Sequence, residues 1–198
     1  MQEIKTIKDL SKAVHEIRDA HAVNMVKLHN KYWKGVDPED ERQVVEAYTE
    51  LAPLLADELF KCLEEIVALV LKVLTKLYKI KNKNVLDIED LMYQDDGYTT
   101  MDRLYKYYIV HKGQRAVYNL VRLVNTESEY VFSGVMEDKL SPDDYPYFRV
   151  DNLDDDECDD CPIGEIFPWT AEHPPFHPDC ECFAEPLTQE QFEKENLN

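Results

Sequence analysis

The residues of this sequence best suited to chemistry are cysteines and a histidine in its last quarter. Cys158 and Cys161 form a Cys-x2-Cys pair, and His177, Cys180 and Cys182 follow after an interval of fifteen residues. Two thiolates with this separation can bind one metal ion together, and a second pair of ligands from a segment that folds back completes its tetrahedral coordination. The spacing therefore predicts a structural Zn²⁺ site.

A closed zinc site takes four ligands, and this region offers five. The favoured set is Cys158, Cys161, His177 and Cys180, with Cys182 as the substitute for Cys180. Prolines beside these residues fix backbone angles, which lowers the entropy lost when the clamps close.

Two alternatives need no metal. In an exported protein, Cys158 or Cys161 could form a disulfide with Cys180 or Cys182. The first ten residues contain Gln, Glu, Lys and Asp where a secretion signal needs an apolar run, which disfavours export. Unrelated cysteines in a floppy acidic tail would leave the surrounding aromatic and proline residues unexplained.

Two further alternatives use zinc differently. A DNA-reading finger would need His173 and His177 on one helix, but Pro174 and Pro175 lie between them. A catalytic zinc of the deaminase kind would need a His-x-Glu motif and Pro-Cys-x-x-Cys, and the chain lacks the His-x-Glu. No proton shuttle stands beside the cysteines, so the sequence predicts a protein without catalytic residues, not an enzyme.

Acidity is concentrated near the carboxyl end of the sequence. The formal net charge is −19, and residues 151–198 hold fifteen acidic residues and one lysine, a net of −14. Contact of this segment with DNA would oppose like charges, so DNA contact is doubtful and a basic protein surface is the better partner. Solvation of an acidic run is the competing explanation. The longest apolar run, residues 66–71, is too short to cross a membrane.

Apolar periodicity predicts a mainly α fold. We expect helices over residues 7–33 with a Thr6 cap, 37–78 with an Asp37 cap, 85–93, 101–124 with a Thr99 or Thr100 cap, and 127–140. Pro53 should bend or divide the second helix, in which Cys62 is expected to be a small buried hydrophobic residue. Gly113 should loosen the fourth.

Short β-prone stretches follow these helices. Residues 145–150 and 164–169 are predicted to form a short β-hairpin, with Phe167, Trp169, Phe176 and Phe183 covering the metal site. The expected organisation is a helical body over residues 1–144 and an acidic Cys/His zinc-binding module and tail over residues 145–198.

The order of these features resembles the Mu F-like phage head-morphogenesis family over roughly the last 85 residues. The resemblance is carried by a helix with Arg115, Ala116, Tyr118 and Asn119, a short strand, an Asp-rich Cys158-x2-Cys161, residues 164–167, and above all the ending Pro-Pro-x-His-Pro-x-Cys-x-Cys at 174–182. Glu181 stands where the family usually has arginine, which weakens any expected DNA contact.

This resemblance implies a minor head protein of the virion, assembled in the host cytoplasm. Such a protein docks on portal or inner capsid proteins in a few copies, which could form a homo-oligomer around the portal. The alternative function is a free adaptor whose acidic zinc module binds a basic protein surface as a nucleic-acid mimic.

Overall fold

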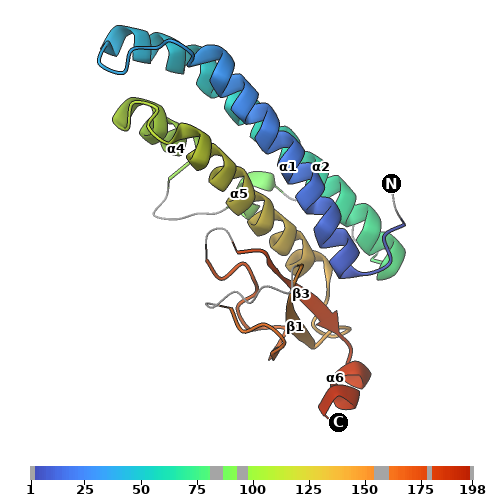
Figure 1. Ribbon diagram of the computed structural model, residues 1–198. Coiled ribbons are helices and arrows are strands. Elements are labelled where there is room, and N and C mark those ends of the chain that lie inside the picture. Colours follow the sequence, from blue (N-terminus) through green and yellow to red (C-terminus); the bar gives the residue numbers. More distant parts are fainter. Residues whose placement is uncertain (1–2, 81–86, 93–97, 154–160, 178–179, 197–198) are drawn as a thin grey trace.

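The computed structural model describes residues 3–80, 87–92, 98–153, 161–177 and 180–196. Three long helices that pack against one another form the body: α1 (Ile7–Tyr32), α2 (Glu41–Leu77) and α5 (Ala116–Lys139). A small sheet lies beside the lower end of these helices in Figure 1, and the fold is mainly helical, as predicted. Within the described residues, no helix is both long enough and apolar enough to span a membrane.

Helix α1 begins where its sequence predicts. The Thr6 hydroxyl accepts a hydrogen bond from the Asp9 N–H at 3.0 Å, and the Asp9 carboxylate accepts one from the Thr6 N–H at 3.1 Å. This reciprocal capping box satisfies two backbone donors that the first turn leaves without partners.

The cap of helix α2 lies three residues after the predicted one, Asp37. The Asp40 side chain accepts hydrogen bonds from the backbone N–H groups of Arg42 and Gln43, whereas Asp37 caps only the preceding turn through the Glu39 N–H. Pro53 was expected to bend or divide this helix, and it does not divide it, because the helix runs unbroken through this exposed residue to Leu77. Proline removes one backbone donor there, but the packing of the rest of the helix holds it together.

The predicted boundary between two helices near residue 125 is also wrong. Helix α5 is continuous across that position, and the chain instead breaks at residues 111–115, after α4 (Thr100–Tyr105) and a π-helix, η1 (Lys106–Val110). Lys112, Gly113 and Arg115 adopt positive φ angles in this break. A Cβ on Gly113 would lie 2.3 Å from Trp33 Nε1, so only glycine allows the turn to approach α1.

Two short helices complete the assignment. The predicted helix at 85–93 is described only over 87–92, where α3 (Ile88–Leu91) packs against α5. Thr99 caps α4 through a second capping box with Asp102, as expected. Helix α6 (Gln189–Asn196), which follows the sheet, was not predicted.

The sheet has three antiparallel strands in the order β2-β1-β3. Strands β1 (Tyr147–Asn152) and β2 (Ile166–Pro168) are the arms of the predicted hairpin, with Phe148 opposite Phe167. The third strand, β3 (Cys182–Leu187), pairs with the whole of β1, from Tyr147 opposite Leu187 to Asn152 opposite Cys182. The prediction did not include β3, whose first residue, Cys182, is the last cysteine of the Cys/His motif.

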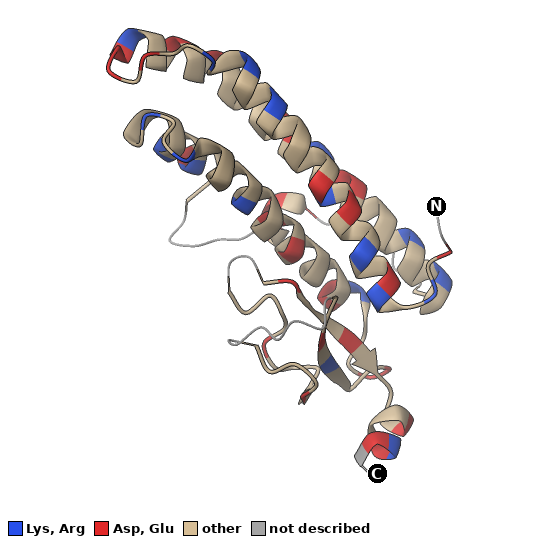
Figure 2. Ribbon diagram, in the orientation of Figure 1, with Lys and Arg blue, Asp and Glu red and all other residues tan. Residues whose placement is uncertain are grey.

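One hydrophobic cluster runs through the helices and the sheet. Buried residues of the helices, such as Leu63 and Leu120, belong to the same cluster as Phe148, Val150 and Phe183 of the sheet. The distribution of charged residues differs between the long helices and the C-terminal elements. Acidic and basic residues mix along α1 and α2, whereas acidic residues outnumber basic ones on the sheet and α6 (Figure 2).

Candidate metal centre

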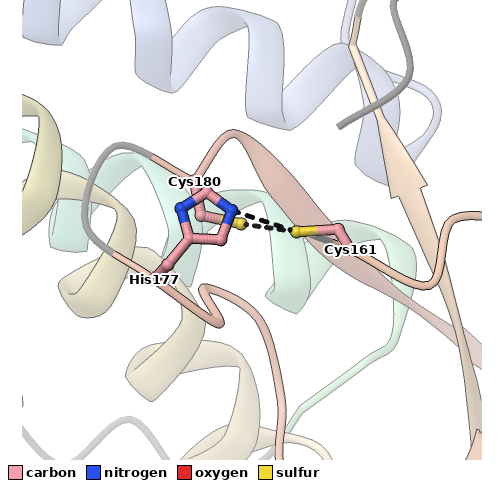
Figure 3. A group of neighbouring side chains, drawn as sticks. All are labelled: Cys161, His177 and Cys180. Carbon is pink, nitrogen blue, oxygen red and sulfur yellow. Dashed lines mark hydrogen bonds between the residues drawn. The ribbon is translucent and has the colours of Figure 1, made fainter. Parts of the chain in front are cut away.

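Three of the predicted ligands converge at one end of the sheet. Cys161 Sγ lies 3.3 Å from His177 Nε2 and 3.5 Å from Cys180 Sγ, and the three ligand atoms lie within 4.8 Å of one another (Figure 3). Zinc–sulfur bonds of about 2.3 Å and zinc–nitrogen bonds of about 2.0–2.1 Å place neighbouring ligand atoms of a tetrahedral site roughly 3.6–3.8 Å apart. The donor set and its spacing therefore fit a metal ion.

A tight turn holds Cys161 against the end of β1. The Ile163 N–H donates to the Cys161 carbonyl at 2.9 Å, while Gly164 and Val150 are joined by a hydrogen bond of 2.8 Å from the Gly164 N–H to the Val150 carbonyl. Gly164 has a φ of +84°, a left-handed conformation that glycine adopts without strain. This turn fixes the distance between Cys161 and the sheet before β2 begins.

A second turn brings the other two ligands together. The Cys180 N–H donates to the His177 carbonyl at 3.1 Å, so the imidazole and the thiol leave the same short loop. Strand β3 begins two residues after Cys180, and its pairing with β1 carries this loop toward Cys161. Antiparallel pairing of β1 and β3 thus brings Cys161 close to His177 and Cys180.

The environment of Cys180 favours its thiolate. A hydrogen bond from the Cys182 thiol lowers the pKa of Cys180 to about 5 despite burial, helped by the backbone N–H groups of Cys182 and Phe176 and by Cys161. The same contact with Cys180, together with burial, raises the pKa of Cys182. Because the thiolate is the ligand form, the lowered pKa of Cys180 suits a metal ligand.

The structure thus gathers Cys161, His177 and Cys180 and leaves Cys182 beside them, buried at the start of β3. Cys158 lies outside the described residues. No disulfide links the cysteines that the structure describes. Cys62 is buried in α2, as predicted, with its sulfur 3.7 Å from the Ser128 hydroxyl.

The aromatic residues expected near the centre occupy the same hydrophobic cluster as its sulfurs. Trp169 and Phe183 are buried together with Cys180, and Phe167 and Phe176 are half-buried against that cluster. An apolar shell of this kind limits the access of water to metal–thiolate bonds.

A buried charge network connects this centre to the helical body. Arg18 Nη1 lies 3.1 Å from the carboxylate of Glu181, the residue between Cys180 and Cys182, and 3.5 Å from that of Glu129. His15 Nε2 lies 2.8 Å from the same Glu129 oxygen. Burial raises the pKa of Glu129 despite these partners.

Sequence reasoning missed this network, although a signal was present. Ser11, His15 and Arg18 recur at helical spacing along one face of α1, and all three are buried. Polar residues at core positions need partners, because an unpaired buried charge is costly. The partners lie on α5 and next to β3, which no local pattern of α1 reveals.

Comparisons of the chain with protein-family models, with curated proteins and with solved structures found no match.

Proposed function

We propose that this is a structural protein whose C-terminal module is held together by one Zn²⁺. Cys161, His177 and Cys180 would be three of the ligands, and Cys158 or Cys182 the fourth. The observation that carries the proposal is the convergence of two thiols and an imidazole at tetrahedral spacing. A closed set of sulfur and nitrogen ligands favours zinc over harder cations, and it leaves no open position for catalysis.

The need for such a fastening follows from the small size of the sheet. Its strands have six, three and six residues. Ordering backbone costs roughly 1–2 kcal/mol per residue, and structural zinc contributes about 10–16 kcal/mol in finger peptides. A metal ion bound where the 161–165 turn meets the start of β3 would tie together the segments that lead into β2 and β3, the two strands that pair with β1.

Metal analysis combined with spectroscopy tests this proposal. We expect natively purified protein to contain one zinc per chain. A strong chelator should then remove the near-ultraviolet circular dichroism of the module, including that of buried Trp169, while the far-ultraviolet helix signal stays largely intact. Metal-free protein with cross-linked sulfurs, or an unchanged near-ultraviolet spectrum after complete metal loss, would contradict it.

We propose further that the protein acts as a phage minor head protein that docks on portal or inner capsid proteins. The support is the ending Pro-Pro-x-His-Pro-x-Cys-x-Cys at 174–182, together with its place after a helix and a short strand. Quantitative proteomics of purified particles and procapsids is the test. We expect a few copies per particle, cross-linked to the portal. Absence from both kinds of particle would refute the role.

A free acidic adaptor is the second candidate. It is favoured by the concentration of charge, since residues 151–198 carry −14 of the net −19. Such an adaptor would bind a basic protein with an affinity that falls steeply as salt is added, and it would not enter virions. The same proteomic experiment therefore separates the two functions.

A further inference from the structure

A second site lies on the other side of the loop that carries the metal ligand His177. A cavity of about 770 Å³ is bounded by α3, by α5 and by residues 171–175. This volume is typical of cavities that bind ligands. Gly134 of α5 faces Leu91 of α3 here, and a Cβ on this glycine would lie 2.8 Å from Leu91 Cδ2. The absence of a side chain on Gly134 thus lets α3 lie close to α5 and form one wall of the cavity.

Negative charge dominates the lining of this cavity. Four carboxylates contribute to it, those of Asp90, Glu137, Asp138 and Glu172, and no lysine or arginine is among the described residues that line it. Asp138 already contacts Lys139 Nζ at 2.6 Å. The other three have no lysine or arginine at salt-bridge distance within the described residues. Burial raises the pKa of Glu137, as expected for a carboxylate that lacks a strong cationic partner.

His173 does not supply the missing positive charge. Its side chain is only 5% exposed, and its Nδ1 lies 3.4 Å from the Glu137 carboxylate. The ring stacks on Phe148 and meets Trp169 edge-on. Burial lowers the pKa of His173 to about 4, so the imidazole is neutral at physiological pH. Its Nε2 is buried without a hydrogen-bond partner among the described residues.

The remaining lining is apolar or aromatic, with Leu91, Tyr130 and Pro175 as examples. This combination does not suit an inorganic cation: within the described residues, only Cys161, His177 and Cys180 bring ligand atoms close enough to hold a metal ion. Dispersed carboxylates between apolar walls suit a larger cation that has its own apolar part. A guanidinium meets carboxylates through a planar fork and stacks on rings, while its aliphatic stem packs on apolar side chains.

We infer that this cavity binds an arginine side chain presented by a basic segment of a partner protein. The carboxylates of Glu137 and Glu172 bind the guanidinium, and Leu91 and Pro175 contact the aliphatic stem. The space beyond one side chain accommodates the residues that flank the arginine. This inference depends neither on the identity of the metal nor on a role in phage heads.

Binding of a peptide pair to the full-length, metal-loaded protein tests the inference. The probe is a fluorescent peptide with one arginine between leucines, and its twin carries citrulline, which has the same shape without the charge. Because hydrogen bonds between charged groups contribute about 1.5–3 kcal/mol, the arginine peptide should bind at least roughly tenfold more tightly. Amide resonances of Ser133, Gly134 and Glu172 should shift on binding. Equal affinity of the twins, or no binding, overturns the inference.

Substitutions and a small competitor sharpen the result. Glu137→Gln and Glu172→Gln should each weaken arginine-peptide binding roughly fivefold to tenfold. Glu64→Gln, at an exposed position of α2 outside the cavity, is the matched control and should leave it unchanged. Circular dichroism and metal content confirm that each variant is folded. Wild-type affinity in both cavity variants, or displacement of the peptide by an equal concentration of spermidine, overturns the assignment to a protein segment.

Discussion

Cys62 and Cys180 are both buried, yet their thiols have opposite acidities. Burial raises the pKa of Cys62 to about 11, whereas hydrogen bonds from Cys182 and nearby backbone groups lower that of Cys180 to about 5. Burial alone disfavours the thiolate, and directed donors overcome it. At the scale of single residues, the hydrogen-bond donors around each sulfur distinguish the candidate ligand Cys180 from the packing residue Cys62.

Replacing one ligand should therefore release the metal, whereas replacing the packing cysteine should not. We expect Cys161→Ser to lose zinc and to lower Tm by at least roughly 20 °C, since structural zinc contributes about 10–16 kcal/mol in finger peptides and each kcal/mol is worth about 2–4 °C in a chain of this size. Cys62→Ala is the matched control and should keep a full equivalent of metal. Native mass spectrometry and thermal unfolding measure both effects. Full zinc retention by Cys161→Ser would remove it from the ligand set.

The titration of His173 should make the fold sensitive to acid. Its pKa of about 4 in the folded protein lies below the ordinary value of 6.5, so between these values the unfolded chain binds more protons. Stability should accordingly fall by roughly 1–3 kcal/mol as the pH decreases from about 6.5 to about 4. Urea unfolding across this range, compared with His173→Gln, isolates the effect from the opposite tendency of Glu137. Parallel pH profiles for the two proteins would contradict this.

At the scale of elements, the turns matter as much as the helices. The break at residues 111–115 lets α5 return along α1, and it depends on the close approach of Gly113 to Trp33. Gly35 also has a positive φ, but nothing lies within 4 Å of the position its Cβ would take. A side chain at Gly35 would therefore meet backbone strain alone, whereas one at Gly113 would meet both backbone strain and steric overlap with Trp33.

Alanine at these two positions should have unequal effects. Gly35→Ala should cost about 1–2 kcal/mol, the strain of a left-handed backbone. Gly113→Ala should cost that and a further roughly 1–3 kcal/mol, because the indole of Trp33 must move. Urea denaturation measures both. Equal costs would show that the indole yields without penalty.

At the scale of the whole molecule, the helical body and the sheet share a core and a buried charge network. Arg18 contacts Glu129 of α5 and Glu181 beside the metal ligands, positions that are far apart in the sequence. The Glu129 side chain is only 2% exposed. Loss of Arg18 would therefore leave the buried Glu129 carboxylate without this guanidinium and in contact with the His15 imidazole.

This arrangement makes Arg18 important for stability. Arg18→Met should destabilise the protein by roughly 3–5 kcal/mol, and the added change Glu129→Gln should restore part of the loss because it removes the uncompensated charge. Arg42→Met is the control: its pair with Glu46 is exposed, so the cost should stay below about 1 kcal/mol. Urea unfolding of the wild type, of the single variants Arg18→Met, Glu129→Gln and Arg42→Met, and of the double variant checks this. An additive double variant would show that the two residues act independently.

The sequence by itself determined the features that depend on neighbouring residues. Apolar periodicity predicted the long helices, the Thr6 and Thr99 caps followed from residues three positions away, and the Cys/His spacing indicated which side chains could meet. These interactions close over one turn of helix or one short loop, so local composition specifies them.

Only the tertiary structure decided what depends on residues far apart in the chain. It placed Cys161 beside His177 and Cys180, paired β3 with β1, turned the loosening expected at Gly113 into a full break of the helix and set Glu181 against Arg18. The free energy of each of these contacts depends on two segments together. The sequence of one segment does not specify where the other will lie. The cavity at His173 has the same origin, because α3, α5 and the 171–175 loop form it only when they are packed together.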